Sequence, residues 1–326
     1  MTPDGPSAEL ARAIHRTMVR IRVFETRIVE LFEAGSLPGF VHTYLGEEAI
    51  AAGVCAALRS DDYITSTHRG HGHAIAKGIE LNAIMAELYG KETGACRGRG
   101  GSMHVADFSI GMLGANGIVA GGLGIAAGAA LSARNRGGDQ VAVAFFGDGA
   151  INKGTFHEAL NFAAVHRLGT VFVCENNHYA QFTAWQRTTA VEDLSIRAAS
   201  YGMPGATVDG NDAAATHHAA LDAVELARSG GGPSLLIMDT YRYGGHYVGD
   251  AEVYRDEAEV EDRLRQDPID RWETTLAADG HLDAGEAAAV WEEARRAVGE
   301  AEAFAEASPY PDPASALDAV FTEASP

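Results

Sequence analysis

Cysteine is scarce in this 326-residue sequence, which contains only Cys55, Cys96 and Cys174. The three residues cannot all pair with one another, and no two of them have the CxxC spacing. A disulfide framework and a cysteine-based zinc site are therefore disfavoured. We expect a cytoplasmic protein with reduced thiols.

Positive charge is also in short supply, because 25 Lys and Arg residues face 45 Asp and Glu residues, a net charge of −20. A protein that binds nucleic acid without sequence specificity needs a basic surface to neutralise phosphates. We therefore expect no nucleic-acid partner, and a small-molecule substrate or protein partners instead.

Long apolar runs are missing as well. No segment reaches the roughly 18 uninterrupted apolar residues of a membrane helix. The opening residues, MTPDGPSAELARAIHR, lack the basic start and apolar stretch of a secretory signal. The sequence thus predicts neither a membrane span nor a signal peptide.

Apolar residues are plentiful, at 46% of the chain, which is enough for a large core. From Ser7 to Ala34 they recur every three or four positions, and this spacing predicts a long helix with Ser7 at its N-cap. GSLPGF ends it. We expect further helices at residues 46–58 and 81–89, with a short strand at 62–67 between them.

The middle of the chain alternates between strands and helices. Apolar runs at residues 140–146, 170–174 and 234–240 are typical of buried strands, and helical patterns separate them. This order predicts an α/β fold with a mostly parallel sheet and helices on both faces. We assign residues 1–45 to an N-terminal helical segment, 46–250 to the main domain, and 251–326 to a C-terminal helical segment and tail packed on that domain.

Two polar motifs directly follow two of these strands. In FFGDGAINKG and VCENNHYAQ, Asp148 and Asn177 stand just beyond the strand ends, where open α/β sheets bind ligands. Their oxygens suit Mg²⁺, which would need diphosphate oxygens to complete its shell. Gly147 and Gly149 allow close backbone approach, and a helix starting near Gly154 adds its positive end. Each motif alone could be an ordinary polar loop, but the two together favour a ligand site.

The spacing of Asp148 and Asn177, 29 positions apart, resembles the motif of thiamine-diphosphate-dependent enzymes. GRGGSMH, GANGIVAGGLGIAAG, GDGAINKGTFHEALNFAAV and TYRYGGH further resemble α subunits of 2-oxo acid dehydrogenase decarboxylase components. Within that family, PGFVHTYLGEEA, DYITSTHRGHGHAIAKG and GHYVGDAEVYR are most similar to acetoin dehydrogenase α subunits. The resemblance implies a thiamine-diphosphate-binding fold with helical N-terminal and C-terminal extensions.

The resemblance also implies roles for individual residues. It assigns Mg²⁺ to the side chains of Asp148 and Asn177 and to the carbonyl of Tyr179. It assigns thiamine diphosphate to His68, Arg69, Gly117, Val119, Asp148, Gly149, Ala150, Asn177 and His246. Three histidines, His42, His71 and His246, are expected to face the reacting atoms, because an imidazole exchanges protons near neutral pH.

The reaction implied by the resemblance is cleavage of acetoin to acetaldehyde, with a two-carbon unit passed to a lipoyl-bearing acyltransferase. A β subunit would supply the Glu that activates the cofactor, in an α2β2 heterotetramer, so this chain alone would be inactive. Pyruvate or branched-chain 2-oxo acids remain alternative substrates. A thiamine-dependent carboligase or ketol transferase, and a non-catalytic binding subunit, remain alternative functions. Bulky Phe182 and Trp185 depart from the family pattern and could alter the pocket or a partner contact.

The stretch ITSTHRGHGHAIAKG raises a separate possibility. His68, His71 and His73 could bind zinc, but no carboxylate or Cys stands nearby in the sequence to complete such a site. We interpret the stretch as a loop over the cofactor in which His73 only packs or hydrogen-bonds. His217 and His218 fall in an expected surface helix and receive no role. GGLGIA fits a dinucleotide-binding pattern, but a glycine-rich loop and not a strand precedes it.

Overall fold

A five-stranded sheet forms the centre of the molecule. The computed structural model describes residues 5–318, and the strand order is β1-β2-β3-β7-β6 with every neighbouring pair parallel. The strands are β1 (Tyr63–Thr65), β2 (Ala142–Gly147), β3 (Thr170–Asn176), β6 (Gly205–Asp209) and β7 (Ser234–Asp239). A separate two-stranded hairpin pairs β4 (Tyr179–Ala180) with β5 (Thr183–Ala184).

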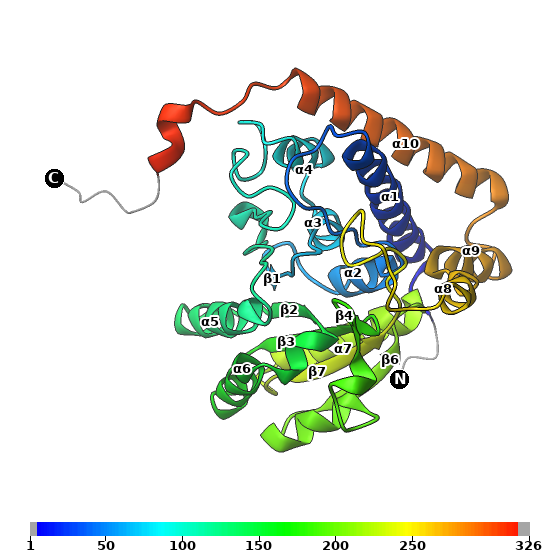
Figure 1. Cartoon of the computed structure of the whole chain (residues 1–326). Helices are drawn as coiled ribbons and strands as arrows, with labels where there is room; N and C mark the ends of the chain where they lie inside the picture. Colours follow the sequence, from blue (N-terminus) through cyan, green and yellow to red (C-terminus); the bar gives the residue numbers. More distant parts are fainter. Residues whose placement is uncertain (1–4, 319–326) are drawn as a thin grey trace.

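Helices cover both faces of this sheet (Figure 1). Alternate residues of a strand point to opposite faces, so Val143 and Phe145 of β2 join one apolar cluster, while Ala144 and Phe146 join another. The first cluster includes residues of α2 (Glu48–Cys55), α3 (His71–Lys77) and α7 (Ala213–Arg228). The second includes residues of α5 (Gly121–Asn135) and α6 (Gly154–Val165). The predicted α/β architecture is confirmed.

The remaining helices form a layer on the side of the first cluster. The Ser7 side chain caps α1 (Ala8–Glu33) by accepting from the Leu10 backbone N–H, as the sequence predicted. Figure 1 shows α1 beside α10 (Ala284–Ala307), and the two helices are in contact. The other helices are α4 (Leu81–Leu88), α8 (Glu257–Leu264) and α9 (Pro268–Ala278). Elsewhere in residues 5–318 the chain forms five 3₁₀ segments, at Phe108–Ile110, Asp148–Asn152, Trp185–Arg187, Leu194–Tyr201 and Pro313–Leu317.

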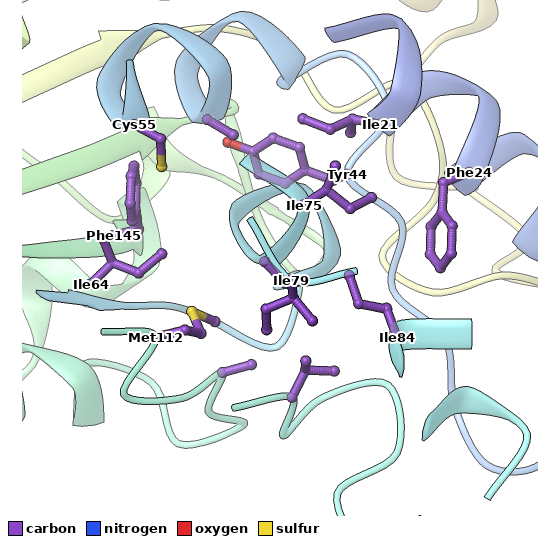
Figure 2. Close-up of a cluster of buried hydrophobic side chains, with 14 of the residues drawn as sticks. Ile21, Phe24, Tyr44, Cys55, Ile64, Ile75, Ile79, Ile84, Met112 and Phe145 are labelled. Carbon is purple, nitrogen blue, oxygen red and sulfur yellow. The ribbon is translucent and has the colours of Figure 1, made fainter. Parts of the chain in front are cut away.

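Side chains from distant parts of the chain meet in the first cluster (Figure 2). Ile21 and Phe24 of α1, Ile75 of α3 and Phe145 of β2 are buried there, and Tyr44 lies among them. Each fully buried side chain of this size stabilises the fold by about 1.5–3 kcal/mol. This packing holds the segments of residues 41–47 and 66–73 against the end of the sheet, where the site lies.

Several local expectations need correction. Strand β6 and the β4-β5 hairpin were not predicted. His71 and His73 stand in helix α3, so only residues 66–70 form the loop expected at this point. His217 is buried and its Nδ1 contacts the carbonyl of Gly53, because its face of α7 packs on α2. The division at residues 45 and 250 stays a prediction, and its outermost residues, 1–4 and 319–326, lie outside the described residues.

Across residues 5–318, no helix has both the length and the apolar character needed to cross a bilayer.

Candidate cofactor site

A cavity of about 460 Å³ opens beyond the carboxyl ends of β2 and β3. Every site residue predicted from the sequence lines it except His71, namely His42, His68, Arg69, Gly117, Val119, Asp148, Gly149, Ala150, Asn177, Tyr179 and His246. Six separate segments of the chain therefore converge on one place. A cavity of this size at strand ends is typical of a site for a cofactor-sized molecule.

Asp148 follows β2 directly and is almost fully buried. Burial raises the pKa of its carboxyl group to about 6, because the charged form loses its hydration. Its Oδ2 is buried and has no hydrogen-bond partner among the described residues. An unpaired buried carboxylate oxygen is costly, and a cation would satisfy it.

Asn177 stands one position beyond the end of β3. Its Nδ2 donates to both carboxylate oxygens of Glu47, at 3.1 and 3.3 Å, and its Oδ1 lies 3.5 Å from the Tyr179 backbone nitrogen. The carbonyl of Tyr179 accepts from the Arg242 guanidinium at 3.3 Å and keeps a second lone pair. Asp148, Asn177 and the Tyr179 carbonyl thus offer the oxygen ligands that Mg²⁺ prefers.

The hairpin that carries Tyr179 approaches the Asp148 loop very closely. A Cβ added to Gly149 would lie 2.8 Å from the Cβ of Ala180, which is too close for any side chain. His178 and Gln181, on either side of the β4 strand, have positive φ angles of 73° and 57°. Backbone strain of this kind persists where the surroundings enforce it, often at functional sites.

Two arginines bring positive charge into the cavity wall. Arg69 is buried and donates to the carbonyls of Thr43 and His246. Burial and the neighbouring Arg242 lower the pKa of its guanidinium to about 10. Arg242 is also buried and donates to the carbonyls of Gly244 and Gln181. Both guanidinium groups line the cavity, where an anion such as a diphosphate would be attracted.

Three histidines meet at this cavity. The ring centroids of His42 lie 4.8 Å from His68 and 5.0 Å from His246. Burial, followed by repulsion from Arg69, lowers the pKa of His42 to about 3, that of His68 to about 2 and that of His246 to about 4. The imidazoles are therefore neutral near pH 7. In each ring one buried nitrogen has no partner within residues 5–318.

His71 and His73 do not join that group. His71 is fully buried in α3, with Nδ1 3.1 Å from Glu25 and Nε2 3.0 Å from the Ser102 hydroxyl. His73 contacts Ser66 and Glu175 and stacks on Phe145, so it packs and hydrogen-bonds as expected. Carboxylates that are distant in the sequence reach these histidines in the fold, because Glu25 contacts His71 and Glu175 contacts His73.

The zinc alternative at His68, His71 and His73 is also not borne out by the geometry. Within the described chain, the three histidines whose nitrogens converge, to within 4.8 Å, are His42, His68 and His246.

Sequence reasoning missed four charged residues that line the cavity, Arg242, Lys153, Glu47 and Glu175. Arg242 lies within the TYRYGGH motif, and Lys153 within the GDGAINKG motif, so their positions carried a signal. Nothing in the local pattern marks Glu47 or Glu175 as buried. Phe182, at the tip of the hairpin, packs edge-on against His246 with a centroid distance of 6.0 Å, whereas Trp185 packs against the second apolar cluster.

Comparison with known proteins identifies this architecture. The model of the dehydrogenase E1 component family matches residues 16–314. The α subunit of acetoin:2,6-dichlorophenolindophenol oxidoreductase from Bacillus subtilis is 50% identical, over 96% of this chain and 94% of the relative. Its counterpart from Cupriavidus necator is 46% identical over the same shares.

A third relative, the pyruvate dehydrogenase E1 component subunit alpha of Rhizobium meliloti, is 40% identical over 91% of this chain and 86% of the relative. These matches cover nearly the whole described fold, including the strands, the cavity and the C-terminal helices. The chain belongs to the dehydrogenase E1 component family, and this membership implies thiamine diphosphate as its cofactor.

Proposed function

We propose that this chain is the α subunit of a thiamine-diphosphate-dependent acetoin dehydrogenase. The observation that carries the choice of substrate is the order of identities, 50% and 46% to two acetoin oxidoreductase α subunits against 34–41% to pyruvate dehydrogenase α subunits. Acetoin would be cleaved to acetaldehyde and a two-carbon unit.

The cavity residues fit the cofactor with Mg²⁺. When bound, thiamine diphosphate supplies a carbon nucleophile and an electron sink for breaking the carbon–carbon bond. Asp148, Asn177 and the Tyr179 carbonyl would hold Mg²⁺, and the unpaired Asp148 Oδ2 is the atom that most needs it. Arg69 would bind diphosphate oxygens with its planar fork. Gly117, Val119 and the backbone of Gly149 and Ala150 would line the cofactor.

His42 and His246 are the residues we propose for proton transfer. Their neutral rings line the cavity, and Nδ1 of each has no partner within residues 5–318. A neutral imidazole nitrogen can accept the hydroxyl proton of acetoin as acetaldehyde leaves, and an imidazole that carries a proton can donate it to the carbonyl oxygen of the substrate. His68 would neighbour the diphosphate. We reassign His71 from a catalytic to a supporting role, since both its nitrogens are occupied by Glu25 and Ser102.

A β subunit completes the proposal, because the relatives are named as α subunits. It would supply the Glu that activates the thiamine ring, in an α2β2 assembly, and a lipoyl-bearing acyltransferase would accept the two-carbon unit. The chain alone would then bind the diphosphate half of the cofactor and have no turnover.

The test is to co-express this chain with its β partner and measure dye reduction with acetoin, pyruvate and branched-chain 2-oxo acids. We expect the highest kcat/KM for acetoin and no turnover without β. A higher kcat/KM for pyruvate would reject acetoin as the substrate and favour the pyruvate dehydrogenase alternative. Transfer of the two-carbon unit to an aldehyde without a lipoyl acceptor would favour a carboligase or ketol transferase.

A further inference from the structure

The side-chain amide of Asn177 has two unlike ends, and only one can bind a metal. Its oxygen carries two lone pairs, one of which the Tyr179 backbone N–H approaches at 3.5 Å, whereas the lone pair of its nitrogen is delocalised into the amide. Nδ2 is held by Glu47, which comes from a segment 130 residues earlier in the chain and lies just before α2. Glu47 is 1% exposed. Because Nδ2 faces Glu47, Oδ1 must face the other way.

Building on the proposed function, we propose that Glu47 is a positioning residue for the metal site. It accepts two hydrogen bonds from the Asn177 Nδ2 group, and so holds the amide with Oδ1 directed to the bound Mg²⁺. Partners of metal ligands commonly fix the orientation of those ligands in this way.

A competing role for Glu47 would be to neutralise Arg69. The Arg69 Nε atom lies 3.8 Å from Glu47 Oε1, which is beyond hydrogen-bond distance, while two other Arg69 nitrogens donate to the carbonyls of Thr43 and His246. The shorter contacts of Glu47 are those to Asn177, at 3.1 and 3.3 Å. The geometry therefore connects Glu47 to the metal ligand more closely than to the diphosphate-facing arginine.

The orientation needs an acceptor oxygen and not a negative charge, and this difference makes the proposal testable. Glu47→Gln keeps an acceptor of the same shape, whereas Glu47→Met removes it at similar volume. In an Asn177→Asp background both ends of the side chain are oxygens, so orientation no longer matters. The measurement is the affinity for Mn²⁺, read by electron paramagnetic resonance on the co-purified α and β chains with thiamine diphosphate present, and it needs no turnover.

We expect Glu47→Met to weaken Mn²⁺ binding 10-fold to 100-fold, and Glu47→Gln by less than about fivefold. In the Asn177→Asp background, Glu47→Met should weaken Mn²⁺ binding by less than about threefold. Equal losses for the Gln and Met variants, or an undiminished loss in the Asn177→Asp background, would overturn the proposal.

The Gln substitution also serves if the Met variant does not fold. The amide that Glu47→Gln introduces can donate to the carboxylate that Asn177→Asp introduces, so the double variant Glu47→Gln, Asn177→Asp should bind Mn²⁺ at least as tightly as Asn177→Asp alone. Tenfold weaker Mn²⁺ binding by the double variant would overturn the proposal. Absence of Mn²⁺ binding in the unsubstituted protein is a different result, which would reject the metal site of the proposed function itself.

Discussion

Gly149→Ala offers a direct test of how the two loops at the metal site depend on each other. The new Cβ would lie 2.8 Å from the Cβ of Ala180, about 0.6 Å inside the 3.4 Å at which ordinary contact begins. Neither atom can rotate away, because both are fixed to the backbone, so the Asp148 loop and the Tyr179 hairpin must separate. Overpacking of this kind costs about 1–3 kcal/mol.

The separation should act on metal binding, because metal–ligand distances tolerate only about 0.2 Å of change. If the full 1–3 kcal/mol falls on the bound state, the affinity for Mg²⁺ with thiamine diphosphate drops roughly fivefold to 150-fold. Titration calorimetry on the α and β assembly would measure it. Ala180→Gly is the matched compensating change, and the double variant should recover most of the affinity. Binding within twofold of the unsubstituted protein in Gly149→Ala, or no recovery in the pair, would refute this reasoning.

Three further predictions concern the cavity and the helix α3 beside it. Arg69→Ala should weaken thiamine diphosphate binding by about 1.5–3 kcal/mol in calorimetry, the value of a hydrogen bond to a charged group. Arg69→Lys should have an affinity between those of the unsubstituted protein and Arg69→Ala. Equal affinity in all three proteins would contradict this prediction. His71→Ala should destabilise the fold by about 1–3 kcal/mol in urea unfolding, because the buried Glu25 side chain loses its contact with His71 and keeps the Tyr44 backbone N–H. Slower turnover at unchanged stability would restore a catalytic role. Stability should fall as pH drops below about 6.5, since an unfolded His68 binds a proton there while the folded residue, with a pKa of about 2, does not. A His68→Gln variant should lose part of that slope in thermal unfolding, and an unchanged slope would argue against a buried neutral ring.

Much of the fold follows from patterns that lie close together in the sequence. The apolar runs that became β2 and β3 contain β-branched and aromatic residues, and that of β7 is formed by Leu, Ile and Met. The apolar spacing of α1 is regular over many turns. Strand β6, GATVD, was missed because it is short and mostly exposed at the sheet edge. The β4-β5 hairpin has two-residue strands, which carry no periodic signal.

In the site, too, local patterns could be predicted from the sequence and contacts between distant segments could not. Asp148 and Asn177 could be paired from the sequence because parallel strands end at one edge, and the structure brings them to the same cavity. His71 could not be separated from its neighbours, because its burial depends on Glu25, which is 46 residues away in the chain. Glu47 was missed for the same reason. Local pattern indicates which strand end a residue occupies, but not which distant side chain it will meet.

The most direct test of the central claim is acetaldehyde release from acetoin by the co-purified α and β chains after chelation of metal and removal of cofactor. We predict that release requires both Mg²⁺ and thiamine diphosphate, and that Asp148→Ala abolishes the response to Mg²⁺ while the protein stays folded. Acetaldehyde release by the stripped assembly, or an unchanged Mg²⁺ response in Asp148→Ala, would contradict the account.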